Sequence, residues 1–316
     1  MHRMKSFLCN LKAFDLVVVV FFIFLVFINI IFHNTIDRWL LFVFINLGVI
    51  FFSFAFGYFE GRYANRFWRI IHYWYIAPLI LFTFKELYYL IHPIRVNDYD
   101  QLFIKIDHWM FGVNPTQWLH QFANPVLTEI LQIVYGLFYF LPIILALALL
   151  RNKRYLAVDF TAFSIVYGFF LSYLGYFALP GVGPRFTLHN FNSINVQLPG
   201  IWLTNFLREL TNIGESIPAG TPHPADIVQR DVFPSGHTMI TLIVIYLSIK
   251  LKSRSRYFLV PIGTLLIFAT VYLWYHYVID LIGGSIFMIF SVWSGKYIFN
   301  WWHRKIGAEE FEYGKY

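Results

Sequence analysis

The sequence has few charged residues and almost no cysteine. Asp, Glu, Lys and Arg make up only 13% of its 316 residues, and Cys9 is the one cysteine. A single cysteine excludes an intramolecular disulfide, and we expect the Cys9 thiol to be inert. The remaining composition, 59% hydrophobic and 22% aromatic, excludes an ordinary soluble domain of this length.

The apolar residues occur in blocks of about 20, which is the length of a helix that crosses a bilayer. The sequence therefore predicts an all-α, polytopic membrane protein. We interpret the first apolar block as an anchor, because no small-residue cleavage site follows it. Eight spans are predicted, at residues 14–32, 40–59, 70–91, 126–150, 158–179, 238–249, 258–274 and 281–299.

Basic residues gather in every second loop, and the net charge is +7. Because loops rich in Lys and Arg stay in the cytoplasm, both termini are expected to be cytoplasmic. The basic excess is then explained by topology and lipid contact, so nucleic acid is not expected as a partner. The basic loops are those around residues 3–12, 62–69, 151–154, 250–256 and 296–315.

Two long connections lie on the opposite, outer side. Residues 92–125 carry three acidic residues and two tryptophans, a pattern typical of interfacial helices lying on the membrane. Residues 180–236 are rich in Pro, Gly and Asn, and we interpret this loop as a lid or substrate-binding element. The acidic residues and tryptophans of the first connection are Asp98, Asp100, Asp107, Trp109 and Trp118.

The predicted sixth span is too short to cross a bilayer. The 14 residues from His237 to Lys250 give about 20 Å of helix, whereas the hydrocarbon core is about 30 Å thick. The preceding Pro-Ser-Gly-His segment is therefore expected below the outer surface. Irregular backbone at that depth needs protein or a wet cavity around it, which predicts a recessed polar pocket.

Two histidines at the outer ends of apolar blocks are the candidate catalytic residues. His276 lies four residues before Asp280, so both occupy one helical face, and Asp280 would hold one imidazole nitrogen while the other attacks phosphorus. The alternative is a structural pair. His237 would protonate the leaving alkoxide, while Ser235 and the Gly236 backbone grip phosphate oxygens. Capping of the helix by Ser235 is compatible with that role.

Two cations are candidates for phosphate binding. Arg185 follows Gly-Pro at the outer end of the fifth span, and its guanidinium suits bidentate phosphate contact; the alternative is an arginine that snorkels to the interface. For Lys85 we expect a structural pair with Glu86, with phosphate binding as the alternative. Residues expected at the surface of the outer loop are His189, His223 and Arg230, while Asp226 and Asp231 are weak candidates for head-group binding.

These motifs together resemble the type-2 phosphatidic acid phosphatase superfamily. The resemblance rests on Gly183-Pro184-Arg185, on Pro234-Ser235-Gly236-His237 and on His276-x-x-x-Asp280, each at the outer end of a span. It implies that the second histidine is the nucleophile, that the first is the proton donor, and that the Ser, Gly and Arg bind phosphate. It covers residues 70–299 as a six-span core, leaving 1–69 as a two-helix extension and 300–316 as a cytoplasmic tail.

Two positions depart from the phosphatase pattern. Ala178 stands where a lysine is usual before the first-motif arginine, and Ala269-Thr270 replace Ser-Arg before the second histidine. Sphingomyelin and inositol phosphorylceramide synthases depart at the same places. The stretch from His276 to Gly284 is similar to the inositol phosphorylceramide synthase form, and so is the stretch 107–141.

The sequence therefore predicts a membrane enzyme that cleaves a lipid phosphate ester through a phosphohistidine, leaning toward head-group transfer to a lipid alcohol. A simple lipid phosphate phosphatase is the first alternative, and a non-catalytic lipid-binding or scramblase-like protein is the second. No zinc-like ligand spacing is present, so we expect neither a metal nor another cofactor. The active site is expected to face the periplasm, the extracellular side or a lumen.

Overall fold

The computed structural model of the protein describes residues 10–315, and within that range it contains helices and no strand. The prediction of an all-α membrane bundle is confirmed. Cys9, together with Arg3 and Lys5 of the first basic stretch, lies outside the described residues.

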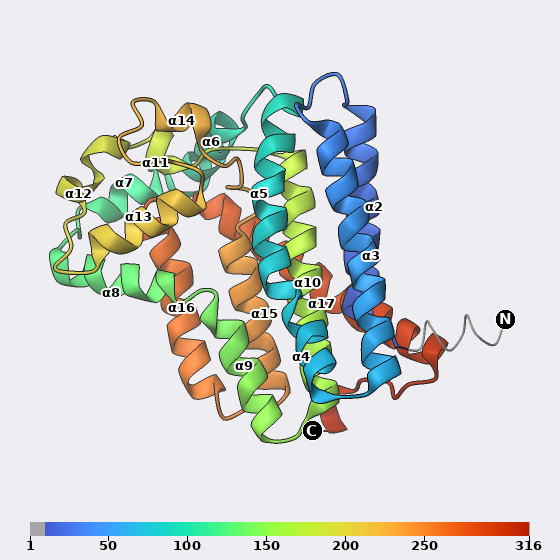
Figure 1. The fold of residues 1–316 in the computed structure, drawn as a ribbon. Coiled ribbons are helices and arrows are strands. Elements are labelled where there is room, and N and C mark those ends of the chain that lie inside the picture. Colours follow the sequence, from blue (N-terminus) through green and yellow to red (C-terminus); the bar gives the residue numbers. More distant parts are fainter. Residues whose placement is uncertain (1–9, 316) are drawn as a thin grey trace.

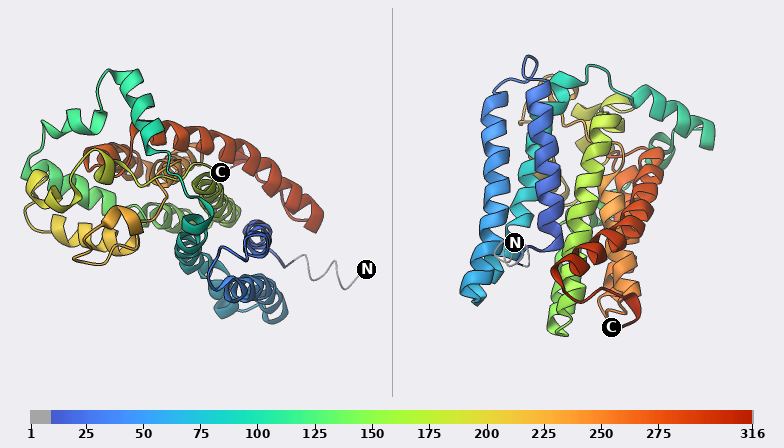
Figure 2. Two further views of the ribbon diagram at one scale, coloured as in Figure 1. Left: turned by 90° about the horizontal axis from the view of Figure 1, so that it is seen from above. Right: turned by 90° about the vertical axis from the view of Figure 1, so that its right-hand side faces the viewer.

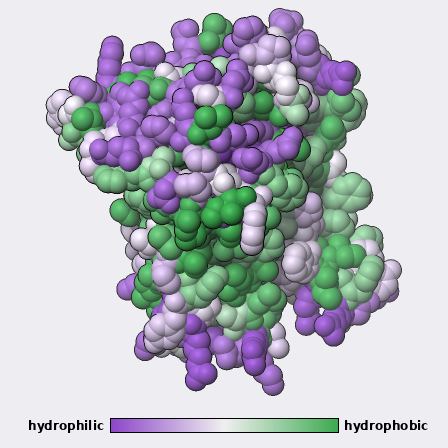
Figure 3. All heavy atoms as spheres, turned by 90° about the vertical axis from the view of Figure 1, so that its left-hand side faces the viewer, coloured by the Kyte–Doolittle hydropathy of each residue, from purple (hydrophilic) through white to green (hydrophobic). Residues whose placement is uncertain are grey.

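Long helices run side by side through the bundle (Figure 1). Five are long and apolar enough to cross a membrane, and a bent pair raises the number to six. Figure 3 shows the result at the surface, an apolar belt with hydrophilic residues at both ends. The five are α2 (Ala13–Ile31), α3 (Trp39–Tyr63), the pair α4–α5 (Arg66–Trp74, Ile76–Ile94), α10 (Tyr155–Ala178) and α17 (Val278–Ile306).

The sixth and seventh predicted spans are shorter helices. They are α15 (Gly236–Lys250), of 15 residues, and α16 (Arg256–Tyr272), of 17 residues. At 1.5 Å per residue, α15 is about 22 Å long, so it falls short of a bilayer core about 30 Å thick. Its N-terminal end, which carries the Ser-Gly-His segment, lies inside the protein beside α10 and α17 (Figure 2).

The fourth predicted span, at 126–150, is a bent pair of helices and not one continuous helix. The chain forms α8 (Pro125–Gly136) and α9 (Phe140–Arg151), which meet at 56°. The physical reason is Glu129, whose carboxylate accepts hydrogen bonds from four backbone N–H groups of residues 201–204 and from the Thr204 hydroxyl. These contacts hold α8 against residues 201–204 of an outer polar layer.

That outer layer covers the end of the bundle where α15 and α17 begin (Figures 1 and 2). The interfacial helices predicted at 92–125 are present as α6 and α7, and Trp109 and Trp118 on them are exposed. The loop 180–236 folds into short helices around α13. The layer contains α6 (Asp100–Phe111), α7 (Pro115–His120), α11 (Pro184–Thr187), α12 (Ile194–Gln197), α13 (Thr204–Gly214) and α14 (Pro224–Ile227).

The two N-terminal helices pack closely on the rest of the bundle. Phe21 of α2 stacks on Phe170 of α10 with ring centroids 4.4 Å apart. Glu86 of α5, which is buried, accepts a hydrogen bond of 2.7 Å from the Asn46 amide of α3. The expected pairing of Lys85 with Glu86 is therefore wrong, because successive residues of a helix point in different directions. Lys85 turns instead toward α13.

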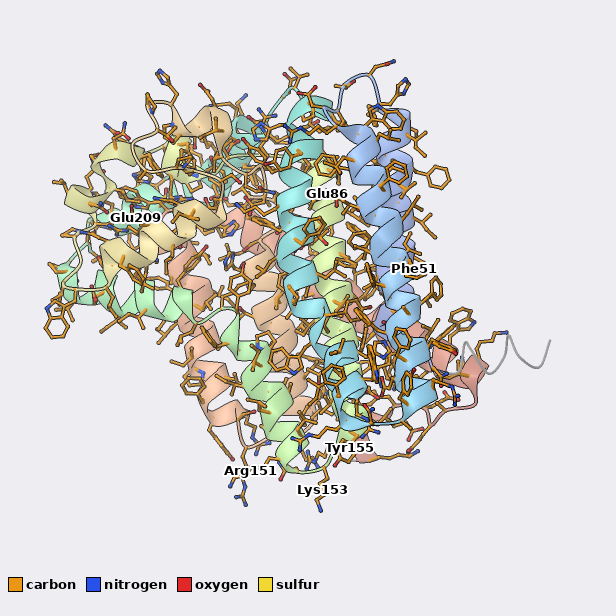
Figure 4. All side chains as sticks on the ribbon, viewed as in Figure 1. Phe51, Glu86, Arg151, Lys153, Tyr155 and Glu209 are labelled. Carbon is orange, nitrogen blue, oxygen red and sulfur yellow. The ribbon has the colours of Figure 1, made fainter. Side chains whose placement is uncertain are left out.

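The basic loop at 151–154 and the outer layer lie at opposite ends of the molecule. Figure 4 shows Arg151 and Lys153 at the far end of α9, while Glu209 lies on α13 in the outer layer. The basic loop and the outer loops, whose difference in charge is the basis of the topology prediction, therefore lie at two ends of one bundle.

Candidate functional site

Arg185 is positioned by the turn that ends α10. The Asp100 carboxylate accepts hydrogen bonds from the backbone N–H groups of Val182 and Gly183, at 2.9 and 2.8 Å. Gly183 has a φ of +97°, which side-chain-bearing residues rarely adopt. This fixed turn leads into α11 and brings the Arg185 side chain over the ring of Tyr275, at 4.4 Å from its centroid.

The guanidinium of Arg185 is buried and already has partners within the chain. It forms an ion pair with Glu215 and donates a hydrogen bond of 3.1 Å to the Asn212 side chain. Only 3% of the residue is exposed. Burial acts against the charge, but the Glu215 carboxylate outweighs it and the pKa of Arg185 is raised. Arg185 is therefore a fixed, charged anchor beside Tyr275, not a mobile interfacial side chain.

The start of α15 is built as a capped helix end. The Ser235 hydroxyl accepts a hydrogen bond from the Thr238 N–H at 3.2 Å, and the Ser235 N–H donates to the Asp280 carbonyl at 3.0 Å. Ser235 is fully buried, and Gly236 packs against the Tyr176 hydroxyl. The capping role considered for Ser235 is thus present. The predicted phosphate contacts of Ser235 and Gly236 remain a prediction.

His276 lies in the turn before α17, and its Nδ1 faces two acceptors. The Val232 carbonyl oxygen is 3.0 Å away and the Asp280 carboxylate 3.4 Å away. A carbonyl only accepts hydrogen bonds, so Nδ1 must carry the hydrogen in the neutral ring. Nε2 then keeps its lone pair for attack. Burial, with a smaller contribution from His237, lowers the pKa of His276 well below its usual range, which favours this neutral form.

Asp280 has a wider role than the sequence predicted. Its carboxylate accepts a hydrogen bond of 2.8 Å from the Tyr277 N–H, and its carbonyl holds Ser235. The nearer partner of the imidazole is the Val232 carbonyl. Asp280 therefore joins the two histidine-bearing segments and contributes a second, longer contact to His276.

His237 lies beside His276, at 5.8 Å between ring centroids. An aromatic stack connects it to the arginine. Tyr135 stacks on His237 at 4.7 Å and on Tyr275 at 4.3 Å, and the Arg185 guanidinium lies over the Tyr275 ring. The stack sets the spacing between the two candidate groups, because aromatic rings and a guanidinium pack face to face.

Asp107 fixes the N-terminus of α17. Its carboxylate accepts hydrogen bonds from the N–H groups of Val278 and Ile279, both at 2.8 Å. A carboxylate at a helix N-terminus pairs with free N–H groups and with the helix dipole. Since His276 comes two residues earlier, this contact also helps to set the direction of the imidazole.

Lys85 reaches the end of α13. Its Nζ donates hydrogen bonds to the Ile213 carbonyl at 3.0 Å and to the Ser216 hydroxyl at 2.9 Å. Glu215 and Asp231 are its acidic neighbours. Lys85 therefore belongs to the charged group around Arg185, although its predicted contact with phosphate remains a prediction.

A cavity of about 280 Å³ borders Arg185. It is lined by two arginines, Arg185 and Arg208, and by amide side chains of the outer layer. Arg208 is 3% exposed, and its Nε is buried with no hydrogen-bond partner among residues 10–315. The amide side chains are Asn192, Asn195, Asn205 and Asn212.

Several residues of this site give no sequence signal of their own. Glu215 and Asn212 lie in a long loop without a motif, and Tyr135 is one of 21 tyrosines. No sequence pattern can identify the Val232 carbonyl, because every residue has a backbone carbonyl. Tyr275 could have been identified from the sequence, since it directly precedes His276. His189 stacks on Trp274 at 3.7 Å, and His223 is exposed.

The contact between α15 and α17 depends on a glycine, which gives a stability prediction. A Cβ on Gly284 would lie 2.6 Å from the Ser235 carbonyl oxygen, a backbone atom that cannot turn aside. We expect Gly284→Ala to destabilise the protein by about 1–3 kcal/mol, and thermal unfolding in detergent measures it. Gly48→Ala is the matched control, because a Cβ at Gly48 meets nothing within 4 Å. Equal melting temperatures of the two variants would contradict the close approach.

The comparison with protein families agrees with this geometry. A family model described as the PAP2 superfamily matches residues 101–294, which is more than half of the chain. The match includes the arginine, both histidines and Asp280. No curated protein and no solved structure matches the chain.

Proposed function

Because the chain belongs to the PAP2 superfamily, we propose that it is a lipid phosphotransferase that moves a phosphorylated head group from one lipid to another. The observation that carries the proposal is the Val232 carbonyl at 3.0 Å from Nδ1 of His276, beside His237. This contact leaves Nε2 as the nucleophile. Membership of the superfamily by itself suggests lipid phosphatase-type activity and does not distinguish transfer from hydrolysis.

The proposed reaction has two steps. Nε2 of His276 attacks phosphorus, the bond from phosphorus to the lipid oxygen breaks, and protonated His237 gives its proton to the departing alkoxide. In the second step an acceptor hydroxyl attacks the phosphohistidine while His237 takes its proton. The bond from phosphorus to Nε2 breaks and the ring returns to its first state. Arg185 stabilises the negative charge on the phosphoryl oxygens in both steps.

One feature supports transfer over hydrolysis, and a second supports a phosphodiester donor. His276 is 5% exposed, and Tyr135 and Phe138 pack on His237, so little room remains for water at the reacting nitrogen. The cavity beside Arg185 offers space for a polar head group attached to the phosphate. A phosphate monoester has no group to place there.

The proposed orientation puts this site on the non-cytoplasmic side and both termini in the cytoplasm. It rests on the basic loop at 151–154, which lies at the end of the bundle opposite the outer layer (Figure 4). The lipid enters sideways from the outer leaflet, and its phosphate meets the histidines near the start of α15.

Products of the protein in liposomes test the proposal. The donor is phosphatidylinositol and the acceptor ceramide, the pair that the resemblance of residues 276–284 implies. We expect diacylglycerol together with a phosphorylated ceramide, detected by mass spectrometry. With a donor labelled in its phosphate, a quench in alkaline detergent, in which phosphohistidine is stable, should also trap label on the peptide that contains His276.

The other outcomes separate the alternatives. Diacylglycerol with a free phosphorylated head group, formed equally with and without ceramide, would indicate a hydrolase. Lipid binding without any product and without label on His276 would indicate a non-catalytic lipid-binding protein. Either result would reject the proposed transfer.

A further inference from the structure

The cation expected to meet phosphate is engaged by an acid of its own chain. Glu215 follows the last residue of α13 and forms the ion pair with Arg185. Its backbone is fixed as well, because its carbonyl accepts a hydrogen bond from the Gln229 N–H at 3.1 Å. Glu215 is thus a built part of the site and not a surface acid that happens to be near.

A second cation and a second acid share this space. Lys85 comes from α5 and binds the segment around Glu215 through Ile213 and Ser216. Asp231 precedes Val232, whose carbonyl holds His276, and lies within electrostatic range of Lys85 and Arg185. The candidate phosphate site therefore contains two cations and two acids.

The two acids differ in their partners, because Glu215 forms the ion pair with Arg185. Burial, and then the neighbouring Glu215 carboxylate, raise the pKa of Asp231 well above its usual range. Two adjacent carboxyl groups avoid carrying two negative charges, and the one paired with an arginine keeps its charge. Burial raises the pKa of Glu215 as well, but Arg185 and Lys85 oppose that rise. The ion pair with Arg185 makes Glu215 the acid that offsets one of the two positive charges of Arg185 and Lys85.

One net positive charge suits one class of phosphate. A phosphate monoester carries about −1.5 to −2 at pH 7, whereas a phosphodiester carries a single negative charge. A carboxylate fixed beside the phosphate penalises the second charge of the monoester far more than it penalises the diester. Specificity often rests on such a repulsive element.

We propose that Glu215 is a specificity-determining residue, which makes the site select lipid phosphodiesters and reject doubly charged lipid phosphomonoesters. The inference deepens the proposed function and rests on the phosphate site assumed there. Its physical basis is the fixed Glu215 carboxylate on the buried Arg185 guanidinium, together with Lys85. Glu215 touches neither reacting nitrogen, so its effect is on which phosphate binds.

Binding measured without turnover tests the idea. The His276→Ala protein in nanodiscs is titrated with phosphatidic acid, a monoester, and with phosphatidylglycerol, a diester with an uncharged head group, at about pH 7.5, where the monoester carries close to two charges. We expect phosphatidylglycerol to bind at least about tenfold more tightly. Adding Glu215→Gln should raise the affinity for phosphatidic acid by about tenfold or more and change that for phosphatidylglycerol little.

Two further variants separate charge from structure. Glu215→Asp keeps the negative charge and should keep the preference for the diester. Glu309→Gln makes the same chemical change at an exposed position after α17, which does not line the cavity, and should leave both affinities unchanged. Equal affinities of the two lipids in the His276→Ala protein, or a parallel loss of both in Glu215→Gln, would overturn the proposal.

The result is independent of the transfer assay. Diester selectivity that disappears in Glu215→Gln, combined with no turnover in the wild type, would reject the proposed enzyme and keep the charge-selective site. Turnover by the wild type, combined with a selectivity that is unchanged in Glu215→Gln, would keep the proposed enzyme and reject the charge-selective site.

Discussion

Replacement of His276 by alanine is expected to lower turnover by about 10⁴-fold or more, because the variant lacks the atom that forms the bond to phosphorus. The initial rate of diacylglycerol release from the donor lipid in liposomes measures the effect. The labelled protein intermediate should disappear at the same time. The fold should survive, because the substitution removes few polar contacts. They are the hydrogen bonds of the imidazole with Val232 and with Asp280.

His223→Ala is the matched control for this result. His223 lies in the same outer loop system, directly before α14, and is exposed. Its removal should leave the rate within a few-fold of the wild type. Two results would refute a phosphohistidine at this position. One is a His276→Ala protein with an unchanged melting temperature and more than a tenth of the wild-type activity, and the other is label still trapped on that protein.

Replacement of Arg185 by alanine is expected to have the second largest effect, a loss of about 10³-fold in activity. Arginines that stabilise charge on a transferring phosphoryl group contribute about 10³- to 10⁵-fold, and the low end applies because Lys85 remains. The same change leaves Glu215 without its cation. Removal of one partner of a buried pair costs about 3 kcal/mol or more, and we expect about 2–3 here since the Glu215 side chain is 16% exposed.

The double variant Arg185→Ala/Glu215→Gln separates the two effects. Because the double variant has no unpaired carboxylate, most of the decrease in melting temperature expected for Arg185→Ala should be absent from it. Activity should remain low, because nothing replaces the guanidinium at the phosphate. Recovery of activity together with stability would show that Arg185 acts only through the fold and would remove it from the phosphate site.

Much of the fold was predictable because hydropathy is a local property. Blocks of about 20 apolar residues give the helices of the bundle, whichever helices they later meet. The errors occur where a polar contact between distant segments decides the path. Glu129 binds the backbone 72 to 75 residues later, and that contact turns α8 away from α9. No property of residues 126–150 alone reveals it.

The candidate site divides in the same way. His237, His276, Asp280, Arg185 and Ser235 were predictable because each stands in a short motif at the outer end of an apolar block, where the chemistry of the side chain is unusual for a membrane segment. Their neighbours were not. Glu215 lies 30 residues from Arg185, and the Val232 carbonyl lies 44 residues from His276.

The sequence by itself therefore determined that this is a helical membrane protein with two histidines, an acid and an arginine at the ends of apolar segments. Only the tertiary structure decided which groups surround them. A backbone carbonyl selects the tautomer of His276, an aromatic stack lies between Arg185 and His237, and Glu215 forms an ion pair with Arg185. The reason is physical: tautomer, spacing and net charge depend on which groups lie within a few ångströms, and in this fold those groups come from distant parts of the chain.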